Sequence, residues 1–194
     1  MLKKIFRKIS TPVGGEHQDT AEGSQSADMA AELLIAPTAL MQLTLDEARV
    51  VVRYMQPQKI TKGTTFIREG DDRDTGFMLL VIDGEATVET LVVSRIDPMT
   101  ITVLGPGSVI GELGLIDGQA RYATCIAATP IRCAILTREA LHLLMDENPV
   151  VAAKLILALS ARIGVRLREI TGKLKMYVQL TQAMEQEIGS RPAA

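Results

Sequence analysis

Aromatic residues, cysteine and histidine are scarce in this chain of 194 residues. Phe, Tyr and Trp together make up 3% of it and Trp is absent, although 47% of the residues are hydrophobic. A buried core must therefore be built from Leu, Ile, Val, Ala and Met. The two cysteines, Cys125 and Cys133, and the two histidines, His17 and His142, lack the spacing of a zinc or iron–sulfur site. This composition indicates cysteines that act as small buried hydrophobes and excludes these metal centres.

Long apolar runs and a strong excess of one charge are also missing. No run reaches the roughly 18–20 apolar residues of a membrane-spanning helix, and the N-terminus lacks the apolar core of a signal peptide. With so few cysteines, the chain is expected in the reducing cytoplasm. The formal net charge is -2 and the isoelectric point is about 5.8. A nucleic acid is therefore not expected as a partner, because proteins that follow a phosphate backbone carry an excess of positive charge.

Residues 1–27 form a first segment without core material. Residues 1–9, MLKKIFRKI, place apolar side chains at helical spacing with lysine and arginine between them, which predicts a short basic amphipathic helix. Such a helix can dock on an anionic membrane surface or in a partner's groove. The alternative is a frayed chain end, because isolated short helices are marginal in water. Residues 10–27 are rich in Gly, Ser, Thr and Pro and are expected to be a linker.

Two helices are predicted between residue 28 and residue 57. The first runs from Asp28 to the break at Pro37. The second begins at Thr44 and Glu47, whose spacing is that of a capping box, and is closed by Pro57. Its inner face is expected to consist of four apolar residues, Leu45, Ala48, Val52 and Met55.

Residues 58–136 change to alternating and apolar patterns that glycines and prolines interrupt. The pattern predicts seven or eight short strands, with turns at Gly63, Gly70, Asp83-Gly84 and Gly105-Pro106-Gly107. Many short strands at this spacing favour a closed or double-sheet antiparallel barrel. The stretch 111–115, Gly-Glu-Leu-Gly-Leu, has no strand alternation and suits a single helical turn.

The C-terminal part is predicted to be helical. Thr137 is the expected N-cap of one helix, which stops before Pro149. A helix of nearly forty residues follows, and from Ile163 to Ile188 its heptad seam is apolar everywhere except Thr181. This seam predicts a parallel homodimer. The alternative is a helix that folds back on itself at Gly164 or Gly172, where each glycine costs about 1 kcal/mol relative to alanine.

The stretch GELGLIDGQARYAT, residues 111–124, resembles the cyclic nucleotide-binding domain family. The resemblance extends over about residues 38–185 and includes GTTFIREGD at 63–71 and IDGEATV at 82–88. It implies a mainly β fold with flanking α-helices, an antiparallel jelly-roll barrel with N-terminal helices and a long C-terminal dimerisation helix. The expected domain boundaries are 1–27 for the N-terminal peptide and linker, 28–147 for the barrel with its helices, and 148–190 for the long helix.

The resemblance also implies a ligand site for cAMP or cGMP. A helix that opens at Gly111 presents unpaired N–H groups that favour an anion. In the family, the residue at the position of Glu112 holds the ribose 2′-hydroxyl and the residue at the position of Arg121 holds the cyclic phosphate. Further phosphate contacts are expected from the backbone amides of Leu113, Tyr122 and Ala123. The alternative is an internal ion pair between Glu112 and Arg121 in an empty barrel, but a buried arginine without an anion would be costly to desolvate.

Three features depart from the family pattern, at Ala120, at Tyr122 and at the pair Arg166 and Leu167. Ala120 replaces a frequent proline, and Tyr122 replaces a residue that is usually Ala, Ser or Thr. The phenol ring can swing outward, stack on a base or fill the pocket. In the family's bacterial transcription factors, the positions of Arg166 and Leu167 offer Thr and Ser to adenine. Arg166 can therefore contact a base, or it can be a solvated residue on the helix surface. The base preference stays open.

Motifs for catalysis and DNA reading are not found. About six residues follow Ile188, too few for a DNA-binding domain, and no catalytic motif or metal triad is visible. The chain is expected to be a non-enzyme without a catalytic cofactor that signals to a separate protein effector through helix rearrangement. The alternatives are a nucleotide-free dimeric scaffold in which Tyr122 plugs the barrel and a DNA-binding dimer that uses the basic residues of the long helix.

Overall fold

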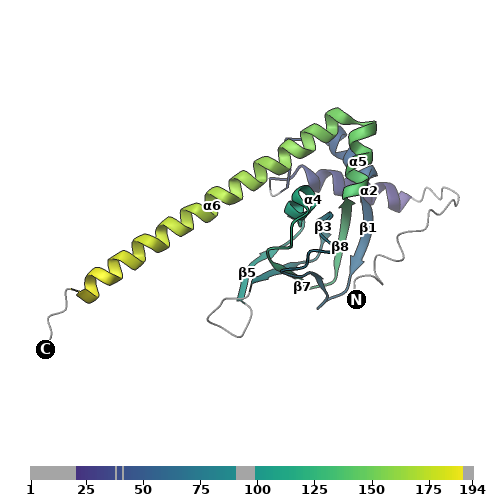
Figure 1. Ribbon diagram of the computed structural model, residues 1–194. Helices are drawn as coiled ribbons and strands as arrows, with labels where there is room; N and C mark the ends of the chain where they lie inside the picture. The colour runs from purple at the N-terminus through teal and green to yellow at the C-terminus, as the bar shows by residue number, and fades with distance from the viewer. Residues whose placement is uncertain (1–20, 38, 41, 91–98, 190–194) are drawn as a thin grey trace.

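The computed structural model describes residues 21–37, 39–40, 42–90 and 99–189. A β-structure of two sheets is flanked by helices, and one long helix extends far beyond it (Figure 1). The predicted basic helix 1–9 and residues 10–20 of the expected linker lie outside the described residues. Residues 21–27, also expected in the linker, instead form the start of helix α2, Ala21–Leu34. The linker prediction is wrong there, because Ala, Glu and Gln in this stretch favour helix enough to offset its glycine and serines.

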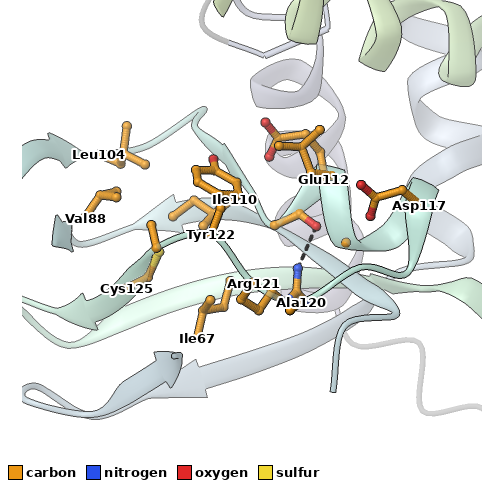
Figure 2. A pocket seen from close by; sticks show the side chains of 14 residues that line it. Ile67, Val88, Leu104, Ile110, Glu112, Asp117, Ala120, Arg121, Tyr122 and Cys125 are labelled. Atoms are coloured by element: carbon orange, nitrogen blue, oxygen red, sulfur yellow. Dashed lines mark hydrogen bonds between the residues drawn. The ribbon is translucent and has the colours of Figure 1, made fainter. Parts of the chain in front are cut away.

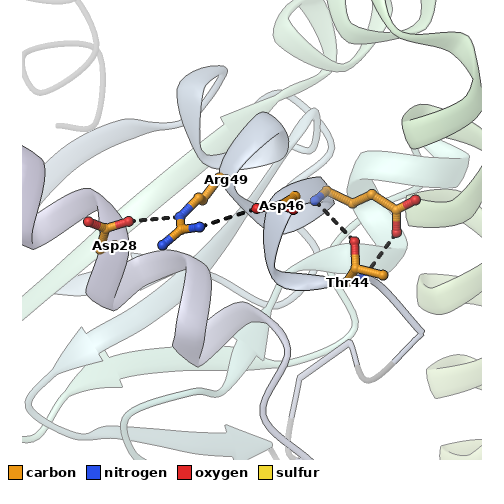
Figure 3. A network of polar contacts seen from close by, with 5 residues as sticks. Asp28, Thr44, Asp46 and Arg49 are labelled. Atoms are coloured by element: carbon orange, nitrogen blue, oxygen red, sulfur yellow. Dashed lines mark hydrogen bonds and ion pairs between the residues drawn. The ribbon is translucent and has the colours of Figure 1, made fainter.

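Helix α3, Leu45–Arg53, begins at the predicted capping box. The backbone N–H of Glu47 donates to Thr44 Oγ1 at 3.3 Å, and that of Thr44 donates to Glu47 Oε2 at 3.0 Å. Arg49 of this helix connects it to α2, because its Nε donates to Asp28 Oδ1 at 2.9 Å (Figure 3). The cap fixes the start of α3, while the half-exposed ion pair adds one contact between helices that pack through buried apolar side chains.

The inner face of α3 differs from the prediction. Ala48, Val51 and Met55 are buried, whereas Leu45 and Val52 are only half-buried. The buried side chains follow the i, i+3, i+7 spacing of one helix face, and Val51 takes the core position that was expected for Val52. The helix also ends at Arg53, so Pro57 does not close it. Pro57 lies in strand β1, at the edge of a sheet where a missing backbone donor is tolerated.

Within the described residues, eight antiparallel strands form the two sheets, in agreement with the seven or eight that the sequence predicts. One sheet has the order β1-β8-β3-β6, with β1 Gln56–Ile60, β8 Ile131–Thr137, β3 Phe77–Asp83 and β6 Val109–Ile110. The other has the order β2-β7-β4-β5, with β2 Thr65–Ile67, β7 Thr124–Ala127, β4 Ala86–Thr90 and β5 Met99–Leu104. This is the predicted mainly β jelly-roll architecture with flanking helices.

Strand β3 has core on both of its faces. Met78 and Leu80 pack with the helices, while Leu79 and Val81 point into the space between the sheets. Alternate side chains of a strand point to opposite faces, so a continuous apolar run is needed here rather than an alternating one. The strand therefore separates the interior of the barrel from the layer of helices.

Both cysteines lie in the barrel core, as predicted. Cys125 and Cys133 are free and buried, with exposed fractions of 4% and 1%. Burial raises the pKa of the Cys125 thiol to about 11 and that of Cys133 to about 12. Both thiols are therefore protonated at neutral pH and act as small hydrophobic side chains.

Two helices follow the barrel. Helix α5, Arg138–Glu147, begins at the predicted N-cap Thr137, and α6, Pro149–Gly189, is one helix of 41 residues. The fold-back alternative is wrong, because α6 continues through Gly164 and Gly172. Its first part is anchored in the core by four buried residues, Ala152, Leu155, Ala158 and Leu159. Its second part projects away from the barrel (Figure 1) and exposes the predicted seam at Leu167, Ile170, Leu174, Tyr177 and Met184.

None of the helices within the described ranges combines enough residues with enough apolar character to cross a bilayer.

Candidate functional site

A short helix between β6 and β7 forms one wall of the site. Helix α4, Glu112–Asp117, is the predicted helical turn, and it starts at Gly111 with a φ of +87°. A side chain at Gly111 would be strained in this left-handed conformation, and its Cβ would lie 2.9 Å from Arg121 Nη1. Glycine therefore lets the backbone turn sharply from the strand into the helix, directly over the Arg121 guanidinium.

Arg121 is buried and is held by backbone carbonyls. Its Nη1 donates to the carbonyl oxygen of Gly111 at 2.9 Å, and its Nη2 donates to those of Asp74 at 3.1 Å and Phe77 at 3.0 Å. The guanidinium also lies 4.5 Å from the centre of the Phe77 ring. The three carbonyl dipoles therefore offset part of the cost of burying this guanidinium. Burial lowers the pKa of Arg121 below its usual value.

Glu112 is the least satisfied polar side chain of the site. It is 1% exposed, and neither carboxylate oxygen accepts a hydrogen bond from any residue that the structure describes. Its ion pair is with Arg166 of α6, with Nη1 3.6 Å from Oε1. The predicted alternative, an internal ion pair between Glu112 and Arg121, is wrong, since Arg121 turns to the carbonyls instead. A buried carboxylate with open acceptor positions is suited to a ligand that brings hydroxyl or amine donors.

The Glu112 and Arg121 side chains both line a pocket inside the barrel (Figure 2). Its apolar wall comes from five residues on five strands, Ile67, Val88, Leu104, Ile110 and Cys125. Its polar end consists of the predicted site residues Gly111, Glu112, Leu113, Arg121, Tyr122 and Ala123, which all line this one pocket. An apolar cavity with a few polar groups at one end suits a small molecule that has a flat apolar part and a polar part.

Tyr122 and Arg166 lie beside the polar end. The Tyr122 ring lines the pocket but is 50% exposed, so it does not plug the barrel. Arg166 reaches it from α6, with its Cζ 5.7 Å from the ring centre. Burial raises the pKa of Tyr122, and the nearby Glu112 charge adds to this effect, so the phenol is neutral at pH 7. All seven predicted site residues are therefore brought to one place by the turn into α4, the segment just before β7, and α6.

The model of the cyclic nucleotide-binding domain family matches residues 57–148, from strand β1 to the end of α5. Every residue that lines the pocket lies within this match. A solved cyclic nucleotide-binding domain from Methylobacillus flagellatus is similar, with 27% identity and a TM-score of 0.67 over 80% of this chain and 85% of the other. The catabolite activator protein of Thermus thermophilus has 25% identity and a TM-score of 0.62 over 75% of this chain and 63% of that one.

Curated relatives are similar over the same domain. A cyclic nucleotide-gated potassium channel of Rhizobium etli is 30% identical over 120 residues, which is 61% of this chain and 31% of the channel. A CRP-like cAMP-activated regulator of Mycobacterium tuberculosis is 23% identical over 66% of this chain and 53% of its own length. The similarity thus covers a domain that these longer proteins share with this chain.

Sequence reasoning missed two arginines that contact the segments around α4. Arg138, the first residue of α5, donates from Nη2 to the carbonyl of Gly114 at 2.7 Å and from Nε to that of Leu115 at 3.2 Å. Arg162 of α6 donates from Nη2 to the carbonyl of Val109 at 3.3 Å. The i, i+4 spacing from Arg166 could have indicated Arg162. No sequence signal connects Arg138 with a helix more than twenty residues earlier.

A glycine within α4 offers a test of this packing. A Cβ at Gly114 would lie 2.5 Å from Arg121 Nη1 and 2.7 Å from the Thr75 carbonyl oxygen. Gly114→Ala should therefore lower the free energy of unfolding by about 1–3 kcal/mol, because the guanidinium must move. The control is Gly172→Ala in α6, where a Cβ meets nothing within 4 Å and stability should rise by up to about 1 kcal/mol. Urea unfolding measures both, and a stabilising Gly114→Ala would contradict the packing.

Proposed function

We propose that the chain is a regulatory module that senses a cyclic nucleotide, cAMP or cGMP, and signals through its helices to a separate protein partner. The observation that carries the proposal is the Glu112 carboxylate, which is 1% exposed and has two oxygens without a hydrogen-bond donor among the described residues. It lies in the pocket of a domain whose family is named for this ligand.

The polar end of the pocket supports one orientation of the ligand. Glu112 accepts a hydrogen bond from the ribose 2′-hydroxyl, which supplies the donor that the carboxylate lacks. The cyclic phosphate lies toward Arg121, whose Nε has no hydrogen-bond partner within the described part of the chain. The backbone amides of Leu113, Tyr122 and Ala123 complete the phosphate contacts. The guanidinium thus keeps its carbonyls and still offers one donor and a positive charge.

The base lies between the apolar wall and the rim. Val88, Leu104 and Cys125 supply flat apolar contacts, and Tyr122 stands half-exposed next to Arg166. An aromatic ring beside a guanidinium provides a surface on which a purine can stack. A scaffold that binds no nucleotide has less support, because that alternative needs Tyr122 to fill the pocket and the ring is half-exposed.

The output of the module is carried by α6 in a homodimer. Five apolar residues of its heptad seam are each more than half exposed, namely Leu167, Ile170, Leu174, Tyr177 and Met184. A second copy of the helix covers such a seam in a parallel coiled coil. The first part of α6 packs in the same core as Leu115 of α4. A shift of α4 on ligand binding therefore changes how the seam is presented to a partner. The module binds and signals, and we propose no catalytic step or catalytic cofactor for it.

Calorimetric titration of purified protein, stripped of bound nucleotide, tests the proposal. Saturable binding of cAMP or cGMP is expected, and 5′-AMP, which lacks the cyclic phosphate, serves as the control ligand. A comparison of the affinities for cAMP and cGMP shows which base the pocket prefers. Sedimentation of the same samples should give the mass of two chains. Absence of binding of either cyclic nucleotide at millimolar concentration would contradict the sensor function, and a single-chain mass would contradict the dimer.

A further inference from the structure

We propose that Arg138 is a positioning residue for the ligand site: it holds the carbonyls at the end of α4 and so fixes how the first turn of α4 faces the pocket. The ligand-binding part of this role rests on the proposed function, whereas the hold on α4 is independent of it. Two hydrogen bonds support the role. Arg138 donates from Nη2 to the Gly114 carbonyl at 2.7 Å and from Nε to the Leu115 carbonyl at 3.2 Å.

Helix α4 is too short to hold itself in place. It has six residues, and a helix of this length is marginal in water because few of its backbone groups pair internally. The carbonyls of its last turn have no following turn to supply their donors. Arg138 donates to two of them, and Thr75 Oγ1 donates to the carbonyl of Gly118, the C-cap, at 3.1 Å. Side chains from outside the helix therefore hold its end.

The charge of Arg138 suits α4 better than its own helix. Arg138 is the first residue of α5, where the positive end of the helix dipole disfavours a cation. At the C-terminal end of α4 the same charge is favourable, because the carbonyls there carry the negative end of the dipole. Helix α5 is capped by Thr137, whose Oγ1 accepts from the N–H of Ala140 at 3.2 Å. A residue that opposes its own helix and stabilises a neighbouring one serves that neighbour.

The packing around the end of α4 leaves the Arg138 guanidinium little room to move. Gly118 has a φ of +69°, and a Cβ at this position would lie 3.0 Å from both Nη1 and Nη2 of Arg138. The backbone N–H of Arg138 donates to the Gly76 carbonyl at 2.8 Å, which fixes the base of the side chain. Arg121 holds the start of α4 through the Gly111 carbonyl at 2.9 Å. The two arginines thus hold α4 at both ends.

A hold on the last turn of α4 also fixes the first, because so short a helix moves as one unit. The first turn carries the Glu112 carboxylate and the backbone N–H of Leu113, which the proposed function assigns to the ribose hydroxyl and the phosphate. Hydrogen bonds depend on distance and direction, so a small rotation of α4 weakens both contacts. Arg138 is not among the residues that line the pocket, so it acts on the ligand through α4.

Titrations with two ligands separate positioning from a general loss of stability. The wild type and Arg138→Met are titrated with the preferred cyclic nucleotide and with its 2′-deoxy counterpart. Arg138→Met is expected to bind the cyclic nucleotide about tenfold more weakly and the deoxy ligand with a much smaller loss, because a displaced Glu112 contributes less to the hydroxyl. Arg138→Lys keeps the charge without the fork and should recover part of the discrimination. Unchanged binding, or equal losses for the two ligands, would overturn the positioning role.

Hydrogen exchange in the nucleotide-free protein tests the hold on α4 without any ligand. Amide exchange within residues 113–118 should become about tenfold faster in Arg138→Met. It should stay unchanged in the control Arg132→Met, which removes an exposed arginine of β8. Unchanged exchange of residues 113–118 in Arg138→Met, or equally faster exchange within residues 141–147 of α5, would overturn the hold on α4. If the wild type binds neither nucleotide, the proposed function fails, whereas the exchange result still decides whether Arg138 holds α4.

Discussion

An Arg121→Ala chain is expected to lose about 3–5 kcal/mol of unfolding free energy, the largest loss predicted for any residue of the site. The substitution leaves the carbonyls of Gly111, Asp74 and Phe77 without their donor in a region where water is largely excluded. It also removes the packing against the Phe77 ring. These carbonyls come from the loop before β3, from β3 itself and from the start of α4. Without the guanidinium, the segments that form the pocket are no longer held to one another. Urea unfolding followed by circular dichroism measures it.

Arg132→Ala is the matched control for that measurement. Arg132 lies on the outside of β8, where its side chain is 52% exposed and pairs with Asp83 at 3.4 Å. An exposed ion pair of this kind contributes at most about 1 kcal/mol. If Arg121→Ala and Arg132→Ala change the unfolding free energy by similar amounts, the carbonyl contacts of Arg121 do not hold the pocket together.

The Glu112→Met chain is expected to be more stable than the wild type without nucleotide and much worse at binding it. Removing a buried carboxylate that no described donor satisfies should raise the unfolding free energy by about 1–2 kcal/mol. Arg166, left without its pair, can hydrate because its side chain is 32% exposed. A hydrogen bond from the ribose to a charged acceptor contributes about 1.5–3 kcal/mol, so the affinity should fall about 10- to 100-fold. Urea unfolding and calorimetric titration measure the two effects.

A variant that gains unfolding free energy but loses nucleotide affinity has lost a residue that serves binding rather than the fold. The control is Glu139→Met. Glu139 is an exposed acid in the first turn of α5, the position that the buried Glu112 has in α4. It should lower stability slightly, through loss of a favourable interaction with the helix dipole, and leave nucleotide affinity unchanged. A Glu112→Met chain that is less stable but binds normally would show that the carboxylate serves the fold.

Local sequence patterns were enough to predict the parts of the fold that depend on neighbouring residues. The capping box at Thr44 and Glu47 and the N-cap at Thr137 follow from residues three positions apart. The helical turn after Gly111 follows from five neighbouring residues without strand alternation. The run Phe77–Ile82 predicts a strand, but not that both of its faces are covered, because that depends on where the helices pack.

The sequence predicted which residues line the pocket, but not which groups these residues contact. Arg121 finds the carbonyls of Asp74 and Phe77 at sequence separations of 47 and 44 residues, which no local pattern encodes. The Glu112–Arg166 ion pair joins helices whose relative position is set by the whole core. On α3 the heptad-like spacing allowed two neighbouring faces, and packing chose the one with Val51. The apolar seam of α6 stays a prediction of a dimer, since its partner is a second chain.

The central claim is that Glu112 holds the ribose 2′-hydroxyl of a cyclic nucleotide. The most direct test compares the preferred cyclic nucleotide with its 2′-deoxy counterpart in calorimetric titrations of wild-type protein. The two ligands differ by one hydroxyl, so folding and pocket shape are held constant. The account predicts that the deoxy ligand binds about 10- to 100-fold more weakly, as expected for the loss of one hydrogen bond to a buried charge. Equal affinities for the two ligands would contradict it.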